Sequence, residues 1–100
     1  MQVTPRAQQR ARTVQQWWRA NQLSAVTTFA DEYEAILGRL AAMSPRSPIG
    51  VRYRNVRGHD VWRVRLKASQ QNVFYSFDEA ADLVVVRMIW GAKRGPVPGF

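Results

Sequence analysis

The spacing of apolar residues changes near Arg46, and this change limits what the chain can fold into. Before Arg46 the apolar residues recur with the 3.6-residue period of amphipathic helices, and after it they alternate with the two-residue period of strands. Helices followed by strands are typical of an α+β domain, in which the helices pack on one face of a sheet. With 100 residues, the chain is long enough for a single domain spanning residues 1–100 and too short for two.

The first helix is predicted to begin at Thr4 and Pro5. A Thr side chain can cap the free N–H groups of a first turn, and Pro has no N–H to leave unpaired there. The helix should end near Asn21. Its predicted buried stripe consists of Ala7, Ala11, Val14 and Trp18.

A second helix is predicted after a short connection at residues 22–23. It should stop at Met43, because the next residue, Ser44, precedes Pro45 and is pushed out of the helical region. Two helices joined so briefly should form an antiparallel hairpin over residues 5–43. The candidate N-caps are Ser24, Thr27 and Thr28, and the predicted buried face is Phe29, Tyr33, Ile36, Leu37 and Leu40.

Four strands are predicted at residues 51–56, 61–68, 73–77 and 83–90, as a meander over residues 50–90 whose first turn is residues 57–60. The last strand is apolar on both faces, so it should lie inside the sheet. A brief strand at residues 1–3 is expected beside it, which gives a small antiparallel sheet with the helix hairpin on one face. Residues 91–100 hold Gly or Pro at five of ten positions and should form an irregular basic tail.

The segment from Val61 to Lys67 alternates strictly between apolar and cationic side chains. Trp62, Val64 and Leu66 should share one face, and Arg63, Arg65 and Lys67 the other. Like charges about 7 Å apart along a strand repel one another, so a row of this kind favours a polyanion or an acidic partner. The structural alternative is a solvated strand face whose cations prevent edge pairing.

The overall charge agrees with an anionic partner. The chain has 15 Lys and Arg against 7 Asp and Glu, a formal net charge of +8. Such a balance indicates nucleic acid, anionic lipid or an acidic protein. Between Arg46 and Lys67 seven cations face one anion, Asp60, so one end of the molecule should be strongly positive.

Composition also excludes several classes of site. Without Cys, and with His59 as the sole histidine, the chain cannot supply a usual zinc set, and we expect neither metal nor cofactor. A catalytic pair of His59 with Asp60 has a simpler explanation in turn formation. The absence of Cys, of a signal-peptide pattern and of an apolar run of roughly 20 residues indicates a cytoplasmic protein without a membrane partner.

Packing explains three of the four tryptophans. Trp18 and Trp62 are expected in the core, and Trp17 at the margin of the first helix stripe, packed on the hairpin and partly exposed. Trp90 is different, because it ends its predicted strand beside Gly91, and a functional role is as well supported there as a structural one. Lys93 and Arg94 follow it and either grip phosphate or solubilise the tail.

The chain resembles, over nearly its whole length, the RelE/ParE superfamily of small toxins from bacterial type II toxin–antitoxin pairs. The resemblance rests on a helix hairpin followed by strands that read G-V-R-Y-R, W-R-V-R-L-K and N-V-F-Y-S-F-D-E-A-A-D-L-V-V-V, and then by I-W-G-A-K-R-G-P-V-P. Its most specific parts are the aromatic strand entering an acidic turn, the next apolar strand and the closing W-G-A-K-R-G-P. It implies a growth-inhibiting toxin with a concave basic face, neutralised in a hetero-oligomer by a cognate antitoxin.

The resemblance implies one of two activities. RelE-like members cut messenger RNA in the ribosomal A site, and ParE-like members act on DNA gyrase. RNA cleavage needs a base, an acid and cations for the phosphorane, and the candidate catalytic residues are Arg63, Arg65, Lys67 and Arg87. Arginine is a poor base, and where many relatives carry a C-terminal His this chain has Trp90, which cannot transfer a proton.

We therefore expect gyrase inhibition, with a ribosome-dependent endoribonuclease or a non-toxic basic nucleic-acid-binding module as alternatives. An acidic antitoxin segment would suit the arginines, which offer two parallel hydrogen bonds to a carboxylate. The residues expected to bind the target or nucleic acid are Arg52, Arg54, Arg63, Arg65, Lys67, Trp90, Lys93 and Arg94.

Overall fold

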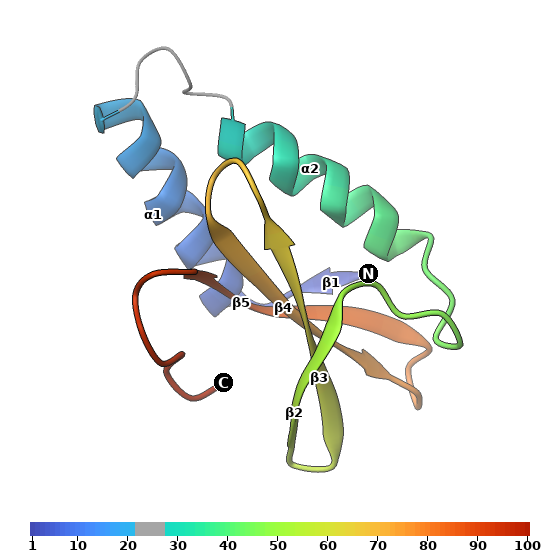
Figure 1. The fold of residues 1–100 in the computed structure, drawn as a ribbon. Coiled ribbons are helices and arrows are strands. Elements are labelled where there is room, and N and C mark those ends of the chain that lie inside the picture. The colour runs from blue at the N-terminus through green and yellow to red at the C-terminus, as the bar shows by residue number, and fades with distance from the viewer. Residues whose placement is uncertain (22–27) are drawn as a thin grey trace.

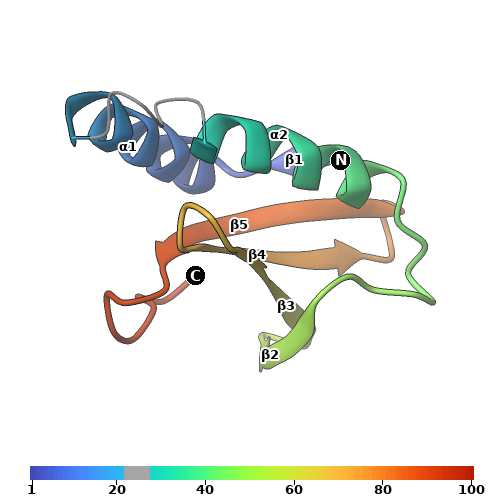
Figure 2. The same ribbon diagram turned by 45° about the horizontal axis from the view of Figure 1, so that its top comes forward.

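The computed structural model describes residues 1–21 and 28–100, and it has two helices and a five-stranded mixed sheet. Both helices lie on the same face of the sheet (Figures 1 and 2). The predicted α+β architecture is confirmed. The elements are β1 (Gln2–Val3), α1 (Pro5–Asn21), α2 (Thr28–Ala41), β2 (Val51–Val56), β3 (His59–Leu66), β4 (Gln71–Asp78) and β5 (Leu83–Gly91).

Helix α1 has the predicted bounds. The side chain of Thr4 accepts a hydrogen bond from the backbone N–H of Ala7 at 3.1 Å, and Pro5 is the first helical residue. At the other end, the side-chain amide of Asn21 donates to the carbonyl of Trp17 at 2.8 Å. The connection predicted at residues 22–23, with candidate caps Ser24 and Thr27, lies outside the described residues.

Helix α2 ends at Ala41, two residues before the predicted stop. The last turn tightens, because the N–H of Met43 bonds the carbonyl of Leu40, three residues back, at 3.2 Å. The two helices run in roughly opposite directions and splay apart (Figure 1).

The sheet has the strand order β1-β5-β4-β3-β2, which puts β5 inside the sheet as expected. The prediction of an antiparallel sheet is wrong for β1, which runs parallel to β5 with Gln2 opposite Val85 and Val3 opposite Val86. No tight turn joins these two strands. The helix layer and the meander lie between them in sequence, so nothing forces the reversed direction that a hairpin would impose.

The main core lies between the helices and the sheet. All the predicted helix stripe residues pack there, with Ala7, Val14, Phe29, Ile36 and Leu40 fully buried. Tyr75 enters this core from β4, and its hydroxyl donates to the carbonyl of Ile49 at 2.6 Å and accepts from the N–H of the same residue at 2.8 Å. Burial raises the pKa of Tyr75, although the hydrogen bond with Ile49 opposes this.

A second, smaller core lies on the opposite face of the sheet. It consists of Val61, Phe74 and Met88, with Tyr53, Val56, Trp90, Val97 and Phe100 packed around them. The segment after β5 therefore turns back over the sheet. The ring of Phe100 lies 5.5 Å from that of Phe74, and the side chain of Arg6 donates to the carbonyl of Gly99. The sequence predicts an irregular tail here, and residues 92–100 contain no helix or strand.

The first β-turn is shorter than predicted. Only Arg57 and Gly58 form it, both with positive φ (53° and 84°), as a two-residue hairpin loop requires. His59 and Asp60 are consequently strand residues, paired with Val56 and Asn55, and the prediction that they belong to the turn is wrong.

Candidate anion-binding surfaces

The cationic row on β3 faces away from the helices. Val64 belongs to the main core and Val61 to the core of the opposite face, so Arg63 and Arg65 lie on the opposite face with Val61. Arg65 is exposed and Arg63 is half-buried. Strand β3 ends at Leu66, so Lys67 lies in the following turn and not at the seventh position of a strand, as the sequence predicted.

The structure brings all three cations of the row together. One shallow hollow of about 370 Å³ lies where β2 begins and is lined by Arg63, Arg65 and Lys67, together with Gly50, Val51, Val64 and Gln70. No Asp or Glu lines this hollow. We call Arg63, Arg65 and Lys67 the basic row.

Two further hollows on the described surface are also lined by cations and by no Asp or Glu. One, of about 570 Å³, is lined by Arg6, Arg54 and Arg57 together with Phe100. The other, of about 580 Å³, is lined by Arg10, Lys93 and Arg94. The expected binding residues are therefore not one surface, because Arg54 and the pair Lys93–Arg94 belong to separate hollows.

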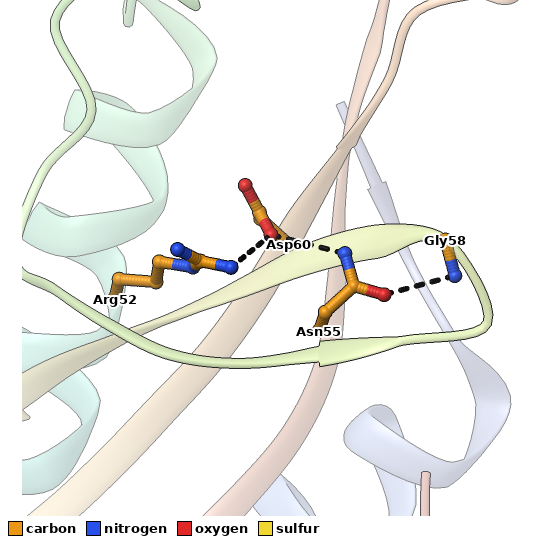
Figure 3. Close-up of polar contacts among 4 residues, drawn as sticks. All are labelled: Arg52, Asn55, Gly58 and Asp60. Atoms are coloured by element: carbon orange, nitrogen blue, oxygen red, sulfur yellow. Dashed lines mark hydrogen bonds and ion pairs between the residues drawn. The ribbon is translucent and has the colours of Figure 1, made fainter.

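Arg52 belongs to none of these hollows. It forms an ion pair of 3.1 Å with Asp60, the one ion pair found in the described part of the chain (Figure 3). The carboxylate of Asp60 also accepts from the side-chain amide of Asn55 at 3.1 Å, and the carbonyl oxygen of that amide accepts from the N–H of Gly58 (Figure 3). This exposed network holds the β2–β3 hairpin, and it neutralises both Arg52 and Asp60.

Neutral side chains of β4 orient two of the candidate catalytic arginines. The Nε of Arg65 donates to the side-chain oxygen of Asn72 at 3.2 Å, and the Nε of Arg87 donates to the hydroxyl of Ser76 at 2.5 Å. Ser76 is fully buried and Asn72 nearly so. Sequence analysis missed both positions. The signal was available, because Asn72 and Ser76 are polar residues on either side of Phe74 on one face of β4.

The side chain of Trp90 contacts both helix α1 and the segment that follows β5. The guanidinium carbons of Arg10 and Arg94 lie 5.1 and 4.2 Å from the centre of its ring, and its indole N–H donates to the carbonyl of Gly95 at 3.3 Å. Arg10 comes from α1, and its Nε also donates to the carbonyl of Ile89. Burial, and then repulsion from Arg94, lower the pKa of Arg10.

Apart from Lys67 itself, the candidate proton-transfer groups are not gathered at the basic row. His59 begins β3 opposite Val56, and the hydroxyl of Tyr75 is bonded to Ile49 on the helix side of the sheet. Tyr53 lies on the same face as the row, with its ring in edge contact with Phe74 at 4.9 Å. The described residues contain no cluster of three or more His, Asp and Glu that could hold a metal ion.

No family model, curated protein or solved structure matches this chain in comparisons with known proteins. The fold and the charges define an α+β domain with three cation-lined hollows, each without a carboxylate. No helix among residues 1–21 and 28–100 is long and apolar enough to cross a membrane.

Proposed function

We propose that this chain is a growth-inhibiting toxin of the RelE/ParE type, that a cognate antitoxin neutralises it in a hetero-oligomer, and that its target is DNA gyrase. The observation that carries the proposal is the basic row, in which Arg63, Arg65 and Lys67 line one hollow with no carboxylate. Like charges held together are unfavourable in the free protein, so the arrangement favours an anionic or acidic partner. The RelE/ParE resemblance supplies the kind of partner.

The chemistry around the basic row favours binding over RNA cleavage. Attack by a ribose 2′-hydroxyl needs a base for that proton and an acid for the leaving oxygen. Arg65 and Arg87 are held by neutral acceptors, and an arginine side chain is a poor general base. Trp90 has no titratable proton to offer. These features support gyrase inhibition more than a ribosome-dependent endoribonuclease.

The antitoxin would find an unpaired strand edge beside the basic row. In the sheet register, β2 begins with Val51 opposite Arg63, so β3 from Val64 to Leu66 is paired with β4 only. An extended acidic segment would add hydrogen bonds along this edge while its carboxylates meet the row. Apolar contacts would be required as well, since exposed ion pairs contribute only about 0–1 kcal/mol each.

Expression in a bacterial host tests the proposal. Inducing the chain alone should arrest growth, and co-expressing the antitoxin encoded beside it should restore growth. A triple variant of the basic row, Arg63→Ala, Arg65→Ala and Lys67→Ala, should lose the arrest. The matched control removes three exposed helix arginines, Arg12→Ala, Arg19→Ala and Arg39→Ala, and should remain toxic. Normal growth at verified high expression of the unaltered chain would contradict the proposal.

Two parallel assays with the purified chain separate the targets. Loss of DNA supercoiling by gyrase with intact message supports the proposed target. Cuts in messenger RNA at the ribosomal A site would instead identify the endoribonuclease. If neither occurs and affinity for DNA falls with salt at a log–log slope of about −0.9 per neutralised phosphate, the chain is a basic nucleic-acid-binding module.

A further inference from the structure

A cavity of about 580 Å³ lies at the end of the sheet, between α1, the turn that follows β3 and the first residues after β5. These segments come together beside α1 in Figure 1. Its size is within the range of small-molecule sites, about 300–1,000 Å³. The wall formed by the turn is held in place, because the carboxylate of Glu32 on α2 accepts the N–H groups of Ala68 and Ser69 at 3.0 and 2.8 Å.

Two buried polar atoms of the lining residues lack a hydrogen-bond partner. One is the indole N–H of Trp18, a donor, and the other is the side-chain oxygen of Gln71, an acceptor. Buried polar groups are nearly always paired in folded proteins, so these two unpaired atoms mark a polar stretch in the otherwise aromatic wall of the cavity. The hydroxyl of Ser69 is also without a partner at hydrogen-bond distance, but it lies beside the Glu32 carboxylate and is not needed for this inference.

The charged side chains that line the cavity favour an anionic ligand. Arg10, Lys93 and Arg94 line it, and no Asp or Glu does. Arg10 and Arg94 both lie over the ring of Trp90, which brings two cations together without a counter-ion among the described residues. The lowered pKa of Arg10, caused by burial and by Arg94, reflects this crowding. An anion between these groups would relieve it.

An aromatic surface borders the same cavity. Trp17, predicted to lie at the margin of the buried stripe of the first helix, has 54% of its surface exposed. Its ring meets that of Trp18 edge to ring at 5.6 Å, and both rings line the cavity. An exposed indole beside a cation cluster offers a stacking surface for a planar ring.

We propose that this cavity binds a nucleotide, with the base against Trp17 and Trp18 and the phosphate at Lys93 and Arg94. The edge of a nucleobase carries both donors and acceptors, which suits a cavity lined by the Gln70 and Gln71 side-chain amides as well as by indole rings. The nucleotide is either free or the end of a nucleic-acid strand. The inference does not depend on the proposed toxin activity, because the basic row lines a different hollow.

Calorimetric titration of the purified chain tests the proposal. The probes are the four ribonucleoside 5′-monophosphates, the corresponding nucleosides, inorganic phosphate and an eight-residue single-stranded RNA. At least one nucleotide, free or as part of the RNA, should bind more than tenfold more tightly than its nucleoside and than phosphate. The double variant Lys93→Ala, Arg94→Ala and the single variant Trp17→Ala should each weaken binding about tenfold or more. Lys93, Arg94 and Trp17 are exposed, so these variants should keep the circular dichroism spectrum of the unaltered chain.

The control variants are Arg19→Ala, an exposed arginine on α1 outside the cavity, and the triple basic-row variant. Both should bind the mononucleotide as the unaltered chain does. Tight binding of RNA without measurable binding of mononucleotides supports a strand end as the ligand, provided that Trp17→Ala abolishes it. The proposal is overturned if no probe binds at millimolar concentration, if phosphate binds as well as the nucleotide, or if only the basic-row variant loses RNA. Nucleotide binding by a chain that does not arrest growth would overturn the proposed function alone.

Discussion

Arg10 and Arg94 approach the same indole ring, that of Trp90, although one belongs to α1 and the other follows β5. The ring thus connects the helix layer, the inner strand and the segment that covers the second core. These contacts explain why a tryptophan lies near the end of β5. Substituting Trp90 therefore tests how much its ring stabilises the packing of α1 and of residues 92–100 against the sheet.

Replacing Trp90 with Ala should destabilise the fold. The substitution removes two cation–π contacts, the hydrogen bond to Gly95 and part of the second core, and we expect a loss of about 2 kcal/mol. Urea unfolding measures it. The matched control is Trp17→Ala, whose exposed ring should cost about 0.5 kcal/mol or less. Equal losses for the two variants would show that these contacts of Trp90 do not stabilise the fold.

Removing the hydroxyl of Tyr75 should destabilise the chain by about 1–3 kcal/mol, because both backbone groups of Ile49 lose their partner. The measurement is the urea midpoint of Tyr75→Phe. Tyr53→Phe is the control, since that residue is held through its ring contacts with Phe74 and Phe100. A midpoint shift as large in Tyr53→Phe as in Tyr75→Phe would contradict the assignment.

The hydroxyl of Tyr75 should also make the stability of the fold depend on pH in the alkaline range. The pKa of Tyr75 is raised in the folded chain by burial, so the folded state favours the protonated phenol. Its contribution is fully present below the unfolded pKa of about 10 and is lost as pH rises above that value. Thermal melts from pH 8 to 11 should therefore fall less steeply for Tyr75→Phe than for the unaltered chain.

Glu32 should make the stability of the fold depend on pH in the acidic range. Burial would raise its pKa, but the neighbouring Ser69 hydroxyl and the hydrogen bonds from the N–H groups of Ala68 and Ser69 lower it overall. Stability from Glu32 is therefore present above the unfolded value of about 4.5 and is lost as pH falls through the lower folded pKa. Glu32→Gln should flatten the stability profile between pH 5 and pH 3, and Glu34→Gln, an exposed neighbour on α2, should leave it unchanged.

Replacing either of two glycines with alanine should change the stability of the fold, in opposite directions at the two positions. Gly50 has a φ of +85°, and a Cβ there would lie 2.2 Å from the carbonyl oxygen of Arg63, so Gly50→Ala should cost about 3 kcal/mol. Gly38 lies in α2 with nothing within 4 Å of its Cβ position, so Gly38→Ala should add about 0.5–1 kcal/mol. Thermal unfolding of the two variants checks both signs, and a tolerated Gly50→Ala would refute the close approach of β2 to Arg63.

Local patterns predicted the helices well, because the buried stripe of each helix and the cap at Thr4 depend on neighbours in sequence. The direction of β1 could not be predicted, since it depends on a pairing across the whole chain. The same limit applies to Phe100, whose contacts with Tyr53 and Phe74 no local period reveals.

The candidate site was predicted in part. Alternation correctly put Arg63 and Arg65 on one face, because side chains in a strand have a fixed period of two. Neutralisation of Arg52 by Asp60 depends on the hairpin register, which the shorter turn at Arg57 and Gly58 sets. The cavity beside α1 joins three segments distant in sequence, so no local pattern predicted it.

The parallel pairing of β1 with β5 has a consequence for biosynthesis. Gln2 and Val3 leave the ribosome well before their partners, Val85 and Val86. During translation β1 must therefore wait unpaired while the helices and the meander emerge, and the sheet is completed only after β5 has left the ribosome. Until then a nascent chain has β1 as an unpaired segment beside its helix layer.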